Sequence, residues 1–286
     1  MSKLWSFAIC TISVVMTIAS IAWAQGYTTI DFPGATATTL NGGPNPKGTS
    51  VGSYTASGVT HGFTVTKKGK FTSFDPPGST GTFPNWMSPR GVIVGQYFDA
   101  SGASHGFVLA NGTYTTVNFP GAPGSGLTSV NASGQMSGFS CDAAACNTTT
   151  HSFVMSKKGK FTGFDPPGAI SSLAVTVIAS GVVFGSYTDS SGVGHGYELN
   201  HGTYTTIDFP GASFTFVGGA NSNGESVGEE VTAGVAHSFL LANGAFTSFD
   251  PPGAVLSDAS GINPSGVIVG LFIDSGGVEH GYIRTP

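Results

Sequence analysis

Six histidines each open the same short motif, in which Gly or Ser follows the histidine and Phe or Tyr comes next. A repeated histidine is a candidate general base, because imidazole changes charge near neutral pH, and also a candidate metal ligand. Which of these roles the histidines can take depends on the side chains that face them. The six are His61, His105, His151, His195, His237 and His280.

A tight turn follows each histidine motif and sets the residues that face one another. Asn111-Gly112 suits a two-residue type I′ hairpin, and Lys67-Lys68-Gly69 suits a three-residue turn with Gly in the left-handed conformation. Counting outward places each histidine opposite an Asp or Asn on the same face of a sheet, within hydrogen-bonding reach. The expected pairs are His61–Asp75, His105–Asn118, His151–Asp165, His195–Asp208, His237–Asp250 and, between the two ends of the chain, His280–Asp31.

Each of these histidines has its own polar partner and belongs to a different copy of the motif. Six such sites lie on a ring too wide to converge on one ion. We therefore interpret the pairs as structural clips between neighbouring strands, with a metal-binding or catalytic role as the alternative.

The elements that carry these residues form a repeat. The stretch Tyr27–Ala35 returns from residues 114 and 204, and a sister form, Phe71–Gly78, returns from residues 161 and 246. The copies are 42 to 47 residues apart, a period that marks one supersecondary unit repeated. Each unit has the pattern of four short strands, A to D, of which C begins with the histidine. We predict an all-β fold, a six-bladed β-propeller with four antiparallel strands per blade; an open solenoid is the alternative.

The two ends of this array complement each other. The sequence stops at Pro286, just after strand C of the sixth repeat, and begins after residue 25 with an unattached strand D, Tyr27–Phe32. Joining them would complete a sixth blade and remove two bare sheet edges. We expect Tyr27–Phe32 to pair antiparallel with Gly281–Ile283 and to close the ring.

Residues 1–24 have the pattern of an export signal, with Lys3, an apolar stretch from Trp5 to Trp23, and Ala22-Trp23-Ala24 as the cleavage site. An uncleaved membrane anchor is the alternative. We expect residues 25–286 to form one propeller domain that is secreted or periplasmic, with no membrane span once the signal is removed. Without Lys3 the chain keeps nine basic residues against 15 acidic ones, which does not suggest nucleic acid as a partner.

Two cysteines remain after the signal, Cys141 and Cys146. They lie in the B–C turn of the third repeat, which is longer than its neighbours, and an exported compartment favours a disulfide between them. A redox or metal-binding pair is the alternative, but no histidine or second cysteine pair completes a ligand set. Phosphate-loop, zinc and nucleophile-elbow motifs are absent from the sequence, and we expect no cofactor.

Three motifs recur in one order: Gly-x-Tyr-Thr-Thr-Ile-Asp-Phe-Pro-Gly-Ala, Asn-x-x-Gly-x-Val-Gly-x-Tyr and Ser-Gly-x-x-His-Gly-Phe. In these motifs the chain resembles the HAF-repeat family of predicted bacterial extracellular repeat proteins, across residues 26–286. It has Gly or Ser where the triplet that names the family has Ala. The resemblance implies a secreted, repeat-built protein and carries over no catalytic residue.

Two residues depart from the repeat, and departures are where function is sought. Trp86 stands in strand A, which would line a central channel, so it is a candidate to stack on a sugar or plug the bore; packing under a Pro-rich loop is the alternative. In our alignment of the repeats, the residues equivalent to Trp86 are Gly43, Ser129, Thr176, Gly219 and Gly261.

Glu230 replaces the aromatic residue of strand B, where a carboxylate is costly unless paired or solvated. We expect local fraying of repeat five there, with a catalytic acid as the alternative.

The basic residues of the mature chain fall in turns that would share one face of the disc, while many acidic residues fall toward the other. The residues expected to contact a ligand are Lys67, Lys68, Lys157, Lys158 and Arg90, with Trp86 nearby. The remaining basic residues of that face are Lys47, Lys70, Lys160 and Arg284.

The sequence therefore predicts a non-enzymatic binding or scaffold module that acts as a monomer and binds an anionic polysaccharide, another envelope polymer or another protein. A propeller glycan hydrolase or lyase with its site at the channel mouth is the alternative; it needs two or three convergent carboxylates or a metal set. A purely structural envelope component is a third interpretation.

Overall fold

The computed structural model describes residues 26–286, which form 24 β-strands and, within this range, no helix. The predicted all-β class is confirmed. The export signal predicted for residues 1–24 lies outside the described residues.

The strands fall into four sets, A to D, according to their place in each repeat. The A strands are β2 (Ala37–Gly42), β6 (Gly81–Met87), β10 (Gly124–Val130), β14 (Ala169–Val177), β18 (Phe214–Ala220) and β22 (Ala254–Ile262). The B strands are β3 (Thr49–Ala56), β7 (Ile93–Phe98), β11 (Met136–Cys141), β15 (Val183–Asp189), β19 (Ser226–Thr232) and β23 (Ile268–Asp274). The C strands are β4 (Val59–Thr66), β8 (Ser104–Ala110), β12 (Thr150–Met155), β16 (Gly194–Asn200), β20 (Val235–Ala242) and β24 (Glu279–Thr285). The D strands are β5 (Phe71–Phe74), β9 (Thr113–Val117), β13 (Phe161–Phe164), β17 (Thr203–Ile207), β21 (Ala245–Phe249) and β1 (Gly26–Ile30).

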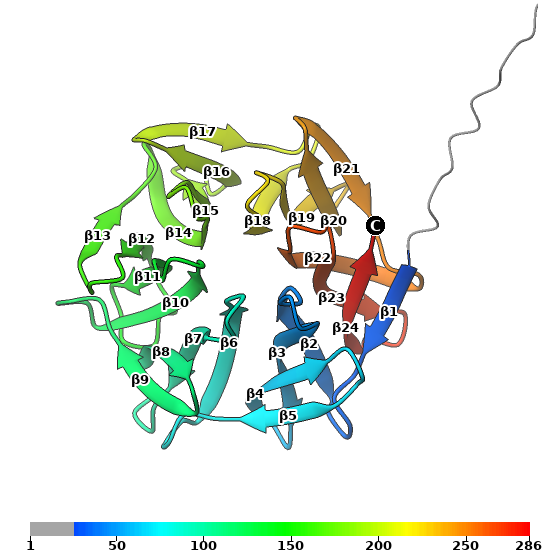
Figure 1. Ribbon diagram of the computed structural model, residues 1–286. Helices are drawn as coiled ribbons and strands as arrows, with labels where there is room; N and C mark the ends of the chain where they lie inside the picture. The colour runs from blue at the N-terminus through cyan, green and yellow to red at the C-terminus, as the bar shows by residue number, and fades with distance from the viewer. Residues whose placement is uncertain (1–25) are drawn as a thin grey trace, which may run out of the picture.

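Consecutive strands of a repeat pair with one another, and the repeats are arranged around a central axis with the A strands innermost (Figure 1). Repeats two to five are separate four-stranded sheets. Repeats one and six share an eight-stranded sheet, because Ala37 of β2 pairs in parallel with Glu279 of β24.

The first and last strands lie side by side, as predicted. β1 pairs antiparallel with β24 from Gly26–Thr285 to Ile30–Gly281 (Figure 1). Tyr27 packs on the core of repeat six, which contains Tyr282, and Phe32, just after β1, packs on the core of repeat one. The N-terminal strand therefore contributes to two hydrophobic clusters as well as to the ladder.

Apolar clusters lie between neighbouring repeats and hold the sheets against one another. Val51 of β3 packs with Phe107 of the next repeat, and Val269 of β23 packs with Phe63 of repeat one. The glycine that follows each of these valines is required by close packing. A Cβ on Gly52 would lie 2.0 Å from the carbonyl oxygen of Thr39, which no side chain can tolerate.

The turns that set the histidine register have the predicted chemistry. Asn111 and Gly112 both have positive φ, 52° and 77°, as a type I′ turn requires. Gly69 has φ 75°, the left-handed conformation expected in the Lys67–Lys70 turn. Gly62 then faces Phe74 and Gly106 faces Val117, so the predicted register is confirmed.

Two expectations at departures from the repeat are wrong. Trp86 corresponds to Gly42 and not to Gly43, because Trp86 pairs with Val94 and Gly42 pairs with the equivalent residue Val51, after the same β-bulge in both A strands. Repeat five is not frayed at Glu230, because β19 and β20 pair without interruption from Ser226 to Thr232.

The carboxylate of Glu230 tolerates its buried position because both of its oxygens accept hydrogen bonds. The side chain is 2% exposed, and Thr232 Oγ1 and Ser248 Oγ donate to it over 2.6 and 3.0 Å. These hydroxyls provide hydrogen bonds that water would otherwise provide to the carboxylate. Burial of Glu230 therefore does not require the strand to fray.

Candidate functional site

The structure brings together all six predicted histidine pairs. In five of them Nδ1 of the histidine lies 2.8–2.9 Å from an aspartate oxygen, and His105 Nδ1 lies 3.1 Å from Asn118 Nδ2. Each pair joins the beginning of a C strand to the residues that follow a D strand. The pairs are separated from one another by whole repeats, and no group of three or more His, Cys, Asp or Glu suited to a metal ion is found among residues 26–286.

Four histidines also contact an aspartate through Nε2, which was not predicted from the sequence; for His151, His195 and His280 it is a second carboxylate, and for His105 it is the only one. The Nε2 atom of His105 lies 3.0 Å from Asp99, and those of His151, His195 and His280 lie 3.4–3.5 Å from an aspartate of the B–C turn. The spacing Asp-x-x-x-x-x-His in repeats two, four and six is a signal that identifies three of these four contacts.

The paired aspartates raise the pKa of three of these imidazoles. Hydrogen bonding to Asp165 raises the pKa of His151. Burial lowers the pKa of His195 and of His280, but hydrogen bonds and charge attraction from two aspartates outweigh it, so the net shift of both is upward. Each of these imidazoles is therefore held as a bridge between two carboxylates.

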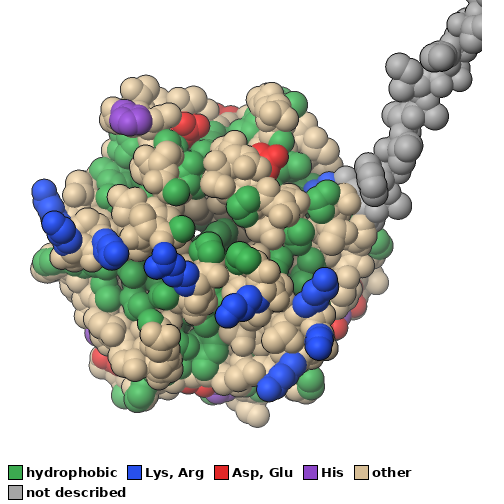
Figure 2. Space-filling view, in the orientation of Figure 1, with side chains coloured by type: hydrophobic (Ala, Val, Ile, Leu, Met, Phe, Trp, Pro, Cys, Tyr) green, Lys and Arg blue, Asp and Glu red, His purple; other side chains and the backbone are tan. Residues whose placement is uncertain are grey.

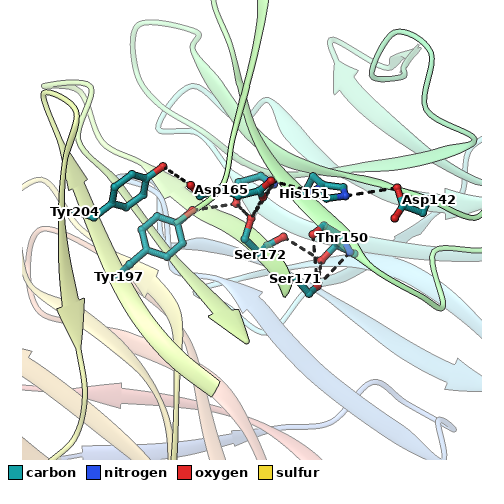
Figure 3. A network of polar contacts seen from close by, with 9 residues as sticks. Asp142, Thr150, His151, Asp165, Ser171, Ser172, Tyr197 and Tyr204 are labelled. Carbon is teal, nitrogen blue, oxygen red and sulfur yellow. Dashed lines mark hydrogen bonds and ion pairs between the residues drawn. The ribbon is translucent and has the colours of Figure 1, made fainter. Parts of the chain in front are cut away.

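A network around Asp165 contains Ser, Asp and His side chains, but the serine contacts the aspartate and not the histidine, unlike a catalytic triad (Figure 3). Asp165 contacts His151 with one oxygen and accepts from Ser172 with the other. Ser172 also contacts Ser152 Oγ over 2.6 Å, and Tyr197 OH lies 3.1 Å from that Oγ. A nucleophilic serine must reach its substrate, whereas Ser172 is 2% exposed and its hydroxyl donates to Asp165 inside the network. The network joins repeats three and four.

The predicted disulfide is present: Cys141 and Cys146 are bonded, with 5.1 Å between their Cα atoms. The loop it closes lies over Gly124 at the start of β10, where a Cβ would be 2.8 Å from Cys146 Sγ. Ser104 N also donates to Ala144 O of this loop over 2.7 Å. The disulfide therefore fixes a loop that contacts two strands of other hairpins.

Lysine and arginine side chains gather on one face, in a band from the left edge to the lower right of the view in Figure 2. A Cβ on Gly48, in an A–B turn, would lie 3.0 Å from Lys67 in the C–D turn of the same repeat, and Gly134 and Lys157 have the same relation at 3.4 Å. The two kinds of turn are thus adjacent. The exposed basic residues are Lys47, Lys67, Lys68, Lys70, Arg90, Lys157, Lys158 and Lys160.

Arg284, near the end of β24, does not belong to this exposed set. It is 5% exposed, and its guanidinium lies 4.3 Å from the centroid of the Phe249 ring. Repeats four and five instead have carboxylates at the equivalent strand ends and turns, Glu198 near the end of β16 and Glu225 in the turn before β19. Acidic side chains are visible in the upper half of the face in Figure 2. The basic surface is therefore restricted to repeats one to three.

The axis of the molecule contains a cavity of about 400 Å³ to which all six A strands contribute. Among residues 26–286, its wall contains aromatic side chains and neutral polar ones, a single carboxylate, Asp258, and no Lys, Arg or His. Figure 2 shows the hollow at the centre of the viewed face. The lining residues used below are Asn85, Trp86, Gln96, Thr176, Phe216 and Asp258.

Trp86 lies in this wall and not among the lysines. Its ring reaches across β2 to repeat six, where a Cβ on Gly261 would be 3.1 Å from Trp86 Cζ3. The ring also packs on the cluster that contains Val94. Of the residues predicted to bind a ligand, the structure therefore groups Lys67, Lys68, Lys157, Lys158 and Arg90 on one surface, with Trp86 inside the bore.

Asp258 is the carboxylate of the cavity wall, and it was not predicted from the sequence. Burial, together with the nearby carboxylate of Glu229, raises the pKa of Asp258 to about 7. Burial also raises the pKa of Glu229. The equivalent residues of the other repeats are Thr39, Phe83, Gly126, Leu173 and Phe216. Asp258 is therefore the one charged residue at this position of strand A, and that difference between repeats could have identified it from the sequence.

No family model matches the chain, and no curated protein matches it. Solved structures do resemble it. A catalytically inactive form of virginiamycin B lyase from Staphylococcus aureus, with quinupristin, superposes with a TM-score of 0.57 at 11% identity, over 92% of this chain and 100% of that one. A six-bladed β-propeller fucose lectin from Aleuria aurantia gives 0.52 at 12% identity, over 90% and 93%.

TolB from Acinetobacter baumannii gives a TM-score of 0.57 at 13% identity, over 87% of this chain and 63% of that one. At such identities the likeness concerns the fold alone. The chain is therefore all-β and propeller-like. Within the described part of the chain, no helix has the length and apolarity needed to cross a membrane.

Proposed function

We propose that this protein is an exported six-bladed β-propeller of the HAF-repeat type that binds an anionic polysaccharide through its basic surface. The β1–β24 ladder and the contact between β2 and β24 support a closed ring. The Cys141–Cys146 disulfide supports an oxidising compartment such as the periplasm or the cell exterior.

The observation that carries the binding role is the gathering of eight exposed Lys and Arg on repeats one to three of an otherwise acidic protein. A polymer with regularly spaced carboxylates or sulfates can contact several of these charges at once, which compensates for the weakness of each exposed pair. Glu198 and Glu225 would repel the same polymer and so limit it to one half of the face.

The test is a salt titration with the mature chain, residues 25–286, and polygalacturonate as the anionic polymer, with dextran as the neutral control. Binding should weaken steeply as ionic strength rises, because exposed charges are screened over about 10 Å at 0.1 M salt. Replacing Lys67, Lys68, Lys157 and Lys158 with Gln should abolish binding at an unchanged melting temperature.

The matched control is Glu198→Gln together with Glu225→Gln, which removes charge from the same face and should strengthen binding. Polygalacturonate binding that survives the four Lys→Gln substitutions, equal binding of dextran, or no binding at low salt would each contradict the proposal.

The alternative of a glycan hydrolase or lyase is favoured only by Asp258, the carboxylate of the cavity wall, with the Glu229 carboxylate near it. Turnover of a polysaccharide panel that is lost in Asp258→Asn would favour the enzyme. Binding of polygalacturonate without turnover would favour the binding module.

A further inference from the structure

The central cavity contains hydrogen-bonding capacity that the protein itself does not use. Gln96 Oε1, Thr176 Oγ1 and Asp258 Oδ1 are buried and make no hydrogen bond within residues 26–286, and all three residues line the cavity. Thr176 is only 4% exposed. Buried polar atoms are nearly always paired, so three unpaired oxygens around one cavity indicate a missing partner there.

The chemistry of these oxygens restricts what that partner can be. An amide oxygen and a carboxylate oxygen accept hydrogen bonds, so the partner must bring donors. Within the described range, the wall offers no basic side chain, and its only charge is negative. Other polar groups of the wall are already occupied: Asn85 Nδ2 donates to Leu127 O over 2.8 Å, for example.

Aromatic rings supply the second part of the recognition. Trp86 and Phe216 line the cavity, and Phe216 pairs with Glu229 across β18 and β19. Carboxylates together with aromatic faces bind ammonium groups, since the rings and the acid both attract positive charge. The volume suits a small molecule and not a polymer, because small-ligand sites span roughly 300–1,000 Å³.

The cavity wall extends along the axis toward the B–C turns, where Phe98, at the end of β7, and Cys146, in the disulfide loop, belong to the lining. The cavity also appears as a hollow at the centre of the face that carries the lysines (Figure 2), but none of those lysines lines it. The cavity wall and the basic surface are therefore formed by different residues.

We propose that the central cavity is a binding site for a small organic ammonium ion, whose charge lies against Asp258 and whose body lies against Trp86 and Phe216. This site is independent of the polysaccharide surface. Asp258 accepts the ammonium hydrogens, and Gln96 and Thr176 bind further donors of the ligand. Gly126 leaves space for the Gln96 side chain in the cavity wall, because a Cβ at Gly126 would be 3.0 Å from Gln96 Oε1.

The experiment compares each cation with a neutral molecule of the same shape: benzylammonium with benzyl alcohol, and cyclohexylammonium with cyclohexanol. Calorimetry on the mature chain at about pH 8, where benzylamine and the carboxyls are charged, measures the affinities. At least one cation should bind about tenfold or more tightly than its neutral partner, the usual scale for a hydrogen bond to a charged group. Asp258→Asn should remove that preference, and Glu198→Gln, which lies outside the cavity lining, should leave it intact.

Proton linkage provides a second readout. The titratable groups that act on Asp258 are Glu229 and Tyr282. Because Asp258 is half protonated near pH 7, a bound cation must release its proton, and affinity should fall about tenfold from pH 8 to pH 6. In Asp258→Asn this pH dependence should disappear.

The proposal is overturned if neither cation binds at concentrations up to about 10 mM, the weak limit for a specific site. It is also overturned if the neutral molecules bind equally well, or if Asp258→Asn retains both the affinity and the preference. Asp258→Asn is isosteric and removes a costly buried charge, so its melting temperature, measured alongside, should equal or exceed that of the parent.

Discussion

The hydroxyl of Tyr197 in repeat four lies 3.1 Å from the hydroxyl of Ser152 in repeat three. Repeats six and five have the same relation, with Tyr282 OH 3.1 Å from Ser238 Oγ. In the other four repeats the residue after the histidine is Gly, and the facing aromatic residue of the next repeat is Phe. At every junction between neighbouring repeats, Ser in one repeat therefore faces Tyr in the next, and Gly in one repeat faces Phe in the next.

The Ser–Tyr match predicts that removing a tyrosine hydroxyl and adding one will have different effects on stability. Tyr197→Phe removes one hydrogen bond and should lower the free energy of unfolding by about 1 kcal/mol. Phe107→Tyr inserts a hydroxyl opposite Gly62, where it has no hydroxyl partner, and should cost about 1–3 kcal/mol. Urea denaturation of both variants measures the difference. Equal costs would show that the junctions do not distinguish the two residues.

Removal of the N-terminal strand should strongly destabilise the fold. Deleting residues 25–34 exposes the edge of β24, breaks the His280–Asp31 contact of 2.8 Å and removes Phe32 from the core of repeat one. We expect a large fall in melting temperature and aggregation through the bare edge. A truncated chain that melts like the mature protein would show that this ladder contributes nothing.

The Cys141–Cys146 disulfide should stabilise only modestly, because it closes a loop with a sequence separation of five. Cys141→Ser with Cys146→Ser should lower the free energy of unfolding by about 1–2 kcal/mol on the loop-entropy scale. Thiol titration of the oxidised, unfolded mature chain should find no free thiol. Two free thiols would contradict the disulfide.

Three clips should give the protein a pH-dependent stability. The pKa values of His151, His195 and His280 are raised in the folded state, so their contribution is fully present below about pH 6.5 and is lost as pH rises through the folded pKa. NMR titration should place these imidazoles above the values that the same residues show in urea. Replacing all three with Gln should flatten the dependence of melting temperature on pH above about 6.5. Unshifted imidazoles would show that the second carboxylate has no effect.

The sequence by itself determined the features that depend on local chemistry. A hairpin register follows from the length and residue types of its turn, which is why the opposition of His61 to Asp75 could be counted from Lys67–Lys70. The repeat period predicted the strand order and the match between β1 and β24, since each strand is defined by its place in a unit. The Ser–Tyr match was also present in the sequence, but only the junction geometry shows which residues face each other.

Tertiary structure decided the features in which several elements meet. Arg284 leaves the basic surface because Phe249, on a strand of the preceding repeat, provides a ring for its guanidinium. Glu230 stays in its strand because Ser248 donates from a strand that does not adjoin β19. Asp258 joins Gln96 and Thr176 around one cavity only because six repeats converge on an axis. Contacts of this kind depend on how sheets pack in space, and neither turn chemistry nor periodicity specifies them.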